Sequence, residues 1–190
     1  MARWEPDARK RLVVAALDLF GEQGYDSTTV TQIASRAGLT KTTFFRHFSD
    51  KREVLFAGQE VHSRLLADGA AAAPDEATPL EVVAAALDAL TASFTAEQRE
   101  RAPRLQAVIA GHPELRERAT FKRAALTAAL VSALGKRGVP DLTAALAADL
   151  GARALDRAFD RWIEPSSQQT LADLAREELR ALRTAAMALG

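Results

Sequence analysis

The chain has no cysteine and only three histidines among its 190 residues. Without thiols it can form neither a disulfide framework nor a thiolate metal site, as is usual in a reducing cytoplasm. His47, His62 and His112 do not have the spacing of zinc ligands, so we expect no metal and no cofactor. No apolar run reaches the roughly 20 residues that a membrane-spanning helix needs, and the N-terminus lacks the apolar core of a signal peptide. We therefore expect a cytoplasmic protein with no membrane partner.

The chain also lacks a net charge, because 25 basic residues balance 25 acidic residues. Their distribution is nevertheless uneven. Residues 1–52 contain nine Lys and Arg against six Asp and Glu, whereas residues 53–190 contain sixteen against nineteen. A mildly basic N-terminal part suits a protein that places one end against an anionic polymer. A bias of three charges does not identify that polymer by itself.

Nearly every segment has the composition of an α-helix, because Ala and Leu are abundant and runs of β-branched residues are absent. We therefore expect an all-α fold of about nine helices, separated by short segments with Gly and Pro. The expected helices span about residues 7–23, 29–37, 41–48, 51–70, 80–94, 101–110, 113–134, 142–163 and 171–189.

Residues 27–48 contain the signals of two short helices joined by a tight turn. Thr29 followed by Gln32 is a capping box at the start of the first helix. Gly38 can adopt the left-handed conformation that ends this helix, and Thr40 can cap the next one. Apolar residues at helical spacing give both helices an inward face.

The second of these helices is predicted to expose a face of hydrogen-bond donors. Phe44 and Phe48 are four residues apart and point inward, and the outward positions are Lys41, Thr42, Thr43, Phe45, Arg46 and His47. Five of these six side chains carry donors, and the DNA major groove offers many acceptors. The pattern predicts a DNA-binding helix-turn-helix. The alternative is a generic helical hairpin with a solvated polar face.

The flanking residues extend this pattern, and about residues 8–57 closely resemble the N-terminal domain of the tetracycline-repressor (TetR) family. The shared features are a helix that ends in Gly24-Tyr25, a capped Thr28-Thr29-Val30 start, Ala37-Gly38 at the turn, and an aromatic recognition helix followed by Lys51. The resemblance implies a transcription regulator with an N-terminal three-helix helix-turn-helix domain and a C-terminal helical domain.

The resemblance also implies contacts with DNA for individual side chains. Lys41, Thr42 and Thr43 would reach base edges, while Thr29 and Thr40 would place helix N-termini against phosphates. The predicted DNA contacts also include the other exposed residues of the second helix and one lysine after it. The full set of predicted DNA-binding residues is Thr29, Thr40, Lys41, Thr42, Thr43, Phe45, Arg46, His47 and Lys51.

Three of these positions carry further expectations. Phe45 stands where the family usually has Tyr, so the hydroxyl that touches a phosphate in the family is missing. His47 and Lys51 match family positions that contact the DNA backbone. Asp50 and Glu53 have the spacing of a second capping box, which puts Lys51 in the first turn of the fourth helix. The N-terminal basic residues form either a DNA-binding arm or solvated surface: Arg3, Arg9, Lys10 and Arg11.

One helix-turn-helix reads only a few base pairs, so specific binding normally needs two half-sites and a two-fold dimer. The last two predicted helices carry broad apolar stripes rich in alanine. The resemblance implies that they pair with a second copy in a four-helix bundle; the alternative is that both stripes belong to the core of one chain. We expect a DNA-binding domain in residues 1–52, a ligand-binding and dimerisation domain in residues 53–190, and a palindromic operator as the partner.

Residues 58–140 contain no catalytic Ser/His/Asp series, no Gly-rich phosphate loop and no acidic metal cluster, so we do not expect an enzyme. Their expected purpose is a helical cage for a small lipophilic effector. Each candidate ligand-binding residue could instead belong to the packed core or to the solvated surface: Phe94, Arg104, Leu105, Ile109, His112, Phe121, Phe159 and Trp162.

These expectations describe a dimeric repressor that leaves its operator when the effector binds, because ligand and DNA would favour different conformations. The fourth helix would be the lever, since it follows Lys51 and continues into the cage. The alternative function is a helical dimeric interaction module without specific DNA binding. The neutral net charge and the missing hydroxyl at Phe45 favour that alternative, and the intact set of Lys41, Arg46, His47 and Lys51 opposes it.

Overall fold

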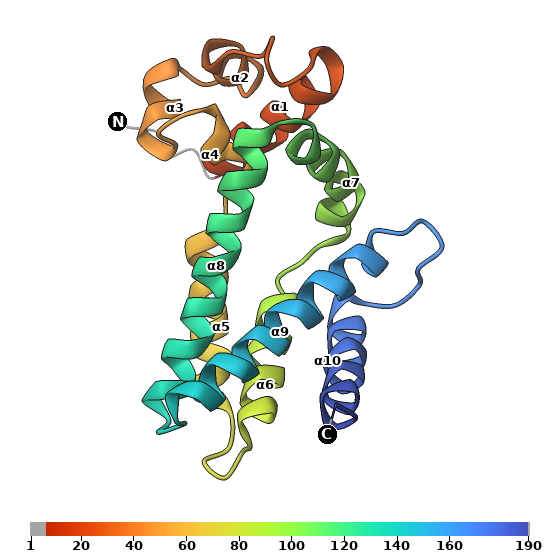
Figure 1. Cartoon of the computed structure of the whole chain (residues 1–190). Helices are drawn as coiled ribbons and strands as arrows, with labels where there is room; N and C mark the ends of the chain where they lie inside the picture. Colours follow the sequence, from red (N-terminus) through yellow and green to blue (C-terminus); the bar gives the residue numbers. More distant parts are fainter. Residues whose placement is uncertain (1–6, 190) are drawn as a thin grey trace. The chain divides into compact units, whose positions relative to one another are not determined.

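The computed structural model of the chain describes residues 7–189. These residues form ten α-helices and no strand (Figure 1), which confirms the all-α prediction. They group into two compact units, namely the described part of Met1–Ala57 with Arg101–Ala119, and Gly58–Glu100 with Thr120–Gly190. Arg3 lies outside the described residues. The functional division into residues 1–52 and 53–190 stays a prediction.

The first unit is built around the three helices of the predicted helix-turn-helix. It contains α1 (Ala8–Gln23), α2 (Val30–Arg36), α3 (Lys41–His47), α4 (Lys51–Leu55), most of α7 (Ala96–Gly111) and the beginning of α8 (Pro113–Lys136). Leu12, Ile33 and Phe44 are fully buried in its core. Leu115 of α8 is fully buried in the same core, so the unit needs a segment from the second half of the chain.

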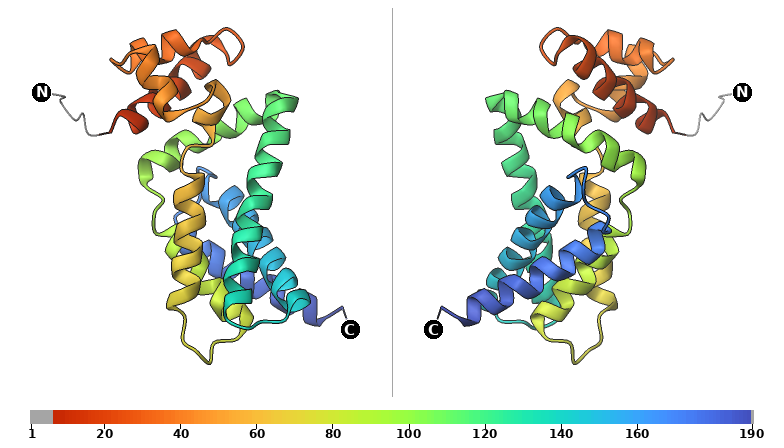
Figure 2. Two further views of the ribbon diagram at one scale, coloured as in Figure 1. Left: turned by 90° about the vertical axis from the view of Figure 1, so that its left-hand side faces the viewer. Right: turned by 90° about the vertical axis from the view of Figure 1, so that its right-hand side faces the viewer.

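The second unit has α6 (Pro79–Thr91) at its centre, in contact with α5 (Gln59–Ala72), α9 (Asp141–Trp162) and α10 (Leu171–Met187) (Figure 2). The remainder of α8 adds Leu130 and Leu134 to the same apolar core. An ion-pair network also joins α9 to α10. The buried carboxylate of Glu178 accepts hydrogen bonds from Arg157 at 2.5 Å and Arg161 at 2.7 Å, so a buried charge is paired.

Two helices differ from their predicted bounds. The fourth predicted helix is two helices, α4 and α5, because the chain breaks at Gly58, which has a left-handed φ of 105°. The helix predicted to begin near residue 101 begins at Ala96, because Thr95 and Gln98 exchange capping hydrogen bonds of 2.8 and 3.2 Å. Pro103 therefore lies inside α7.

No single helix within residues 7–189 is both long enough and apolar enough to cross a membrane. Only α6 and α7 taken together have the length and composition of a membrane-spanning segment, and the chain is bent between these two helices.

Candidate nucleic-acid interface

The beginning of α2 has the capping box that its sequence predicts. The Thr29 hydroxyl accepts a hydrogen bond from the Gln32 amide at 3.3 Å, and the Gln32 side chain accepts one from the Thr29 amide at 2.8 Å. Two backbone N–H groups that no helical carbonyl can pair are thereby satisfied. The result is a well-defined N-terminus for the first helix of the hairpin.

The turn between α2 and α3 depends on Gly38, whose φ is 67°. The amide of Leu39 donates to the Ala34 carbonyl at 2.8 Å and closes the helix end. Arg11 of α1 donates to the Ala37 carbonyl on the other side of the turn. A Cβ on Gly38 would lie 2.7 Å from the Arg11 guanidinium, so both the conformation and the space favour glycine.

The recognition helix α3 begins at the predicted cap, where the Thr40 hydroxyl accepts from the Thr43 amide at 3.1 Å. Phe44 and Phe48 are buried and their ring centroids lie 5.6 Å apart. This inward pair turns Lys41, Thr42 and Arg46 outward, where all of them are exposed.

The other three residues of that face differ in how available they are. Phe45 is 50% exposed, and the Lys41 ammonium lies 5.9 Å from its ring centroid. Thr43 is half-buried, and its hydroxyl shares a 2.9 Å hydrogen bond with the Thr40 hydroxyl. Burial lowers the pKa of His47, and the positive charges of Arg46 and Arg9 lower it further, so this imidazole is neutral at pH 7.

Two of the N-terminal basic residues make contacts within the first unit. The Arg9 guanidinium lies 5.4 Å from the ring centroid of Phe48, and Arg11 bonds to the turn carbonyl described above. At the other end of the hairpin, Asp50 caps α4 through hydrogen bonds from the amides of Arg52 and Glu53 at 2.8 and 3.1 Å. The second capping box is only half formed, because the Glu53 carboxylate pairs with Arg118 at 2.7 Å.

Lys51 is the first residue of α4, and its ammonium points back into the protein. Nζ donates to the carbonyls of Tyr25 at 2.7 Å, Thr28 at 3.1 Å and Asp26 at 3.3 Å. It also lies 4.2 Å from the centroid of the Tyr25 ring. A contact between Lys51 and the DNA backbone, as predicted from the sequence, would compete with these internal hydrogen bonds.

The predicted ligand-binding residues fall into different parts of the chain. Phe94, Phe159 and Trp162 pack together in the second unit, with ring centroids 5.7 to 6.2 Å apart. Leu105 and Ile109 pack against the core of the first unit instead. The remaining members are His112, whose ring contacts that of Tyr25 in the first unit, and two exposed residues, Arg104 and Phe121.

The sequence analysis missed His62, which stacks on Phe94 with centroids 5.4 Å apart and planes inclined by 25°. Burial lowers the pKa of His62 below its usual value, so the imidazole is held neutral among aromatic rings. His62 lies one helical turn after Gly58, where the helix breaks. That position in the sequence is the signal that could have identified it.

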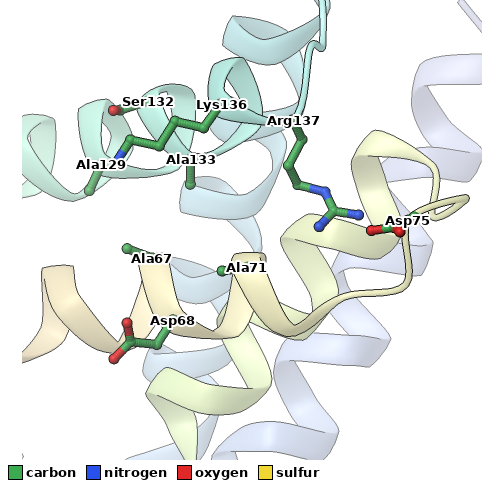
Figure 3. Close-up of a pocket in the computed structure, with 9 residues that line it drawn as sticks. All are labelled: Ala67, Asp68, Ala71, Asp75, Ala129, Ser132, Ala133, Lys136 and Arg137. Atoms are coloured by element: carbon green, nitrogen blue, oxygen red, sulfur yellow. The ribbon is translucent and has the colours of Figure 1, made fainter.

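A cavity of about 790 Å³ lies between α5 and α8 in the second unit (Figure 3). Small side chains of the two helices face each other across it, Ala67 and Ala71 from α5 and Ala133 from α8. Asp68 and Lys136 stand at its sides. Among residues 7–189, no group of three or more His, Cys, Asp or Glu is arranged to hold a metal ion.

Comparison with known proteins matches the helix-turn-helix region to one family. The profile described as "Bacterial regulatory proteins, tetR family" matches residues 12–57. The HTH-type transcriptional regulator TcmR of Streptomyces glaucescens is 52% identical over 46 residues, which are 24% of this chain and 20% of that protein. The HTH-type transcriptional regulator BetI of Rhizobium meliloti (strain 1021) is 37% identical over 95 residues, 50% of this chain and 45% of that protein. The chain thus spans less than half the length of these curated relatives.

Solved structures extend the likeness along the chain. The structure of Thermus thermophilus FadR, a TetR-family transcriptional repressor in complex with lauroyl-CoA, has a TM-score of 0.57 and 25% identity, covering 92% of this chain and 93% of that one. Mycobacterium smegmatis AmtR has a TM-score of 0.58 and 24% identity, covering 95% and 88%. The likeness to AmtR shows the fold alone. TcmR, BetI and FadR are named as regulators of transcription, not as enzymes.

Proposed function

We propose that the chain is a transcriptional regulator of the TetR family, whose profile matches residues 12–57, and that it binds a palindromic operator as a homodimer in the cytoplasm and represses transcription until a small lipophilic effector releases it. The observation that carries DNA binding is the exposed side of α3. Lys41, Thr42 and Arg46 face solvent while Phe44 is fully buried beneath them. A short helix with such a face suits the major groove, whose base edges and flanking phosphates accept hydrogen bonds.

Different parts of this face have different roles in the proposal. Lys41 and Thr42 reach base edges, and Arg46 and His47 contact the DNA backbone. Thr43, whose hydroxyl is bonded to Thr40, offers its methyl group to a thymine. The remaining members contribute helix N-termini for phosphates and an apolar contact with the sugar-phosphate chain: Thr29, Thr40 and Phe45.

Large apolar side chains on α9 and α10 support the homodimer. Leu142 and Leu146 are one turn apart on α9 and are 74% and 58% exposed, and Met187 near the end of α10 is 74% exposed. A chain in isolation would leave these side chains in water. A second copy that packs its own α9 and α10 against these side chains would cover them, and a two-fold axis would then relate the two recognition helices.

The second unit supports the effector part of the proposal. FadR of Thermus thermophilus was solved with lauroyl-CoA, and compounds with a fatty acyl chain are the first class to test here. The cavity between α5 and α8 has a volume in the range that holds a small ligand. Its alanine side chains would contact the apolar part of such a ligand, and Lys136 would contact a polar group at one end of it. The aromatic cluster of Phe94, Phe159 and Trp162 is the second apolar feature of this unit.

Selection of bound sequences from random duplex DNA tests the proposal. We expect an inverted repeat, a dimeric mass in solution, and affinity that falls steeply as salt rises. Thr42→Ala should change the preferred base at one position of each half-site, because an exposed hydroxyl of α3 reads it. A dimer with no preference for any duplex over bulk competitor DNA would refute the proposal and favour an interaction module. An unchanged preference in Thr42→Ala would remove only that residue from base reading.

A further inference from the structure

The ammonium of Lys51 has no unused hydrogen-bond donor. An ammonium carries three N–H donors, and Nζ has three carbonyl acceptors within 3.3 Å, namely those of Tyr25, Asp26 and Thr28. The face of the Tyr25 ring lies 4.2 Å away and adds a cation–π contact. A phosphate would therefore have to replace bonds that the folded chain already makes.

The three carbonyls belong to the turn that connects α1 to α2. Within the turn, the Thr28 hydroxyl donates to the Gly24 carbonyl at 2.7 Å and the Thr28 amide donates to the Tyr25 carbonyl at 3.2 Å. The Gln23 side chain also donates to the Ser27 carbonyl at 3.3 Å and to the Thr28 hydroxyl at 3.2 Å. The next residue, Thr29, is the cap of α2. The Lys51 ammonium consequently fixes the beginning of α2, on which α3 packs, against the beginning of α4.

The same turn receives the corner between α7 and α8. The His112 ring contacts the Tyr25 ring with centroids 4.8 Å apart, and its Nε2 lies 3.6 Å from the Asp26 carboxylate. Its Nδ1 lies 2.8 Å from the Val108 carbonyl, which can only accept, so Nδ1 carries the hydrogen. Tyr25 is thus buried between a cation from α4 and an imidazole from the corner.

We infer that Lys51 is a positioning residue, which holds the turn at residues 25–28 and through it the α2–α3 pair, and that it does not neutralise a DNA phosphate. The inference rests on the proposed function, because it concerns how the DNA-reading helices are held. Arg46, an exposed cation on α3, is the natural comparison.

The dependence of operator affinity on salt separates the two roles. Each neutralised phosphate contributes about 0.9 to the slope of log affinity against log salt. For a dimer, Arg46→Met should therefore reduce the slope by about 1.8. Lys51→Met should weaken binding by the same factor at every salt concentration and leave the slope of the wild type unchanged. A reduction of about 1.8 in Lys51→Met as well would overturn the inference.

A second measurement needs no operator-binding variant. Tyr25 is the only tyrosine of the chain, so 3-fluorotyrosine gives a single ¹⁹F resonance for it. The resonance of the wild type should keep its position when the operator is added, because the ammonium stays over the ring. Movement on DNA binding would show that Lys51 leaves the ring, and would overturn the inference even if Lys51→Met failed to fold. Absence of specific binding by the wild type would instead refute the proposed function, and the inference with it.

Discussion

Replacement of Gly69 by alanine tests how closely α5 and α6 approach each other. Gly69 lies inside α5, and a Cβ at this position would lie 2.7 Å from the Ala85 carbonyl oxygen, 2.7 Å from the Ala89 Cβ and 2.9 Å from the Ala86 Cα. Two of these atoms are backbone atoms of α6, so no side-chain rotation can relieve the contacts. The two helices must separate to admit the methyl group.

The expected free energy follows from two opposing contributions. Alanine is favoured over glycine inside a helix by about 0.5 to 1 kcal/mol. Forcing an extra methyl group into a packed core costs about 1 to 3 kcal/mol. Gly69→Ala should therefore lower the free energy of unfolding by up to about 2.5 kcal/mol. For a protein of this size, 1 kcal/mol corresponds to about 2 to 4 °C in Tm.

Gly135→Ala is the matched control, because Gly135 lies in α8 and a Cβ there would meet no atom within 4 Å. It should raise the free energy of unfolding by about 0.5 to 1 kcal/mol. The difference between the two variants isolates the contacts with α6. Thermal unfolding followed by circular dichroism measures both. If Gly69→Ala raised Tm as much as Gly135→Ala, the reasoning about α5 and α6 would be wrong.

Two further substitutions test other parts of the molecule. Burial in the folded state lowers the pKa of His62 below its usual value of 6.5. Near and below pH 6.5 the unfolded chain therefore binds more protons than the folded chain, and the free energy of unfolding falls as the pH falls. His62→Phe should therefore lose less Tm than the wild type between pH 7.5 and pH 5.5; His47, also lowered, keeps part of the loss. Phe45→Tyr should tighten operator binding by about 1 kcal/mol per half-site, roughly 30-fold for the dimer, by adding a hydroxyl at an exposed position. Unchanged affinity in a filter-binding or fluorescence titration would remove Phe45 from the DNA contact.

The parts of the hairpin that the sequence predicts correctly are held by partners only a few residues apart. The capping box of Thr29 and Gln32, the left-handed Gly38 and the cap at Thr40 all involve spacings of three or four residues. Such signals act within one turn of helix and do not depend on the rest of the fold. The same kind of signal at Thr95 was available and predicts the true beginning of α7.

The assignment of residues 101–119 to the first unit could not be predicted from such local signals. Leu105, Ile109 and Leu115 have the spacing of a helical apolar face, and this spacing says only that they are buried. Whether they are buried in the second unit or against the helix-turn-helix depends on tertiary contacts across more than 50 residues of chain. The predicted cage of eight residues failed to gather in one unit for this reason, whereas three of its aromatic members, Phe94, Phe159 and Trp162, did gather.

Lys41 and Lys51 show that the same local motif can leave one lysine exposed and turn another inward. Each is the first residue of a short helix and follows a capping residue, Thr40 in one case and Asp50 in the other. The difference arises from residues 25–28, a turn whose carbonyls are not paired by a helix or a sheet and which therefore need donors. An ammonium supplies three donors from one atom. On the inference above, the acceptors of that turn, rather than a phosphate on DNA, account for a lysine at position 51.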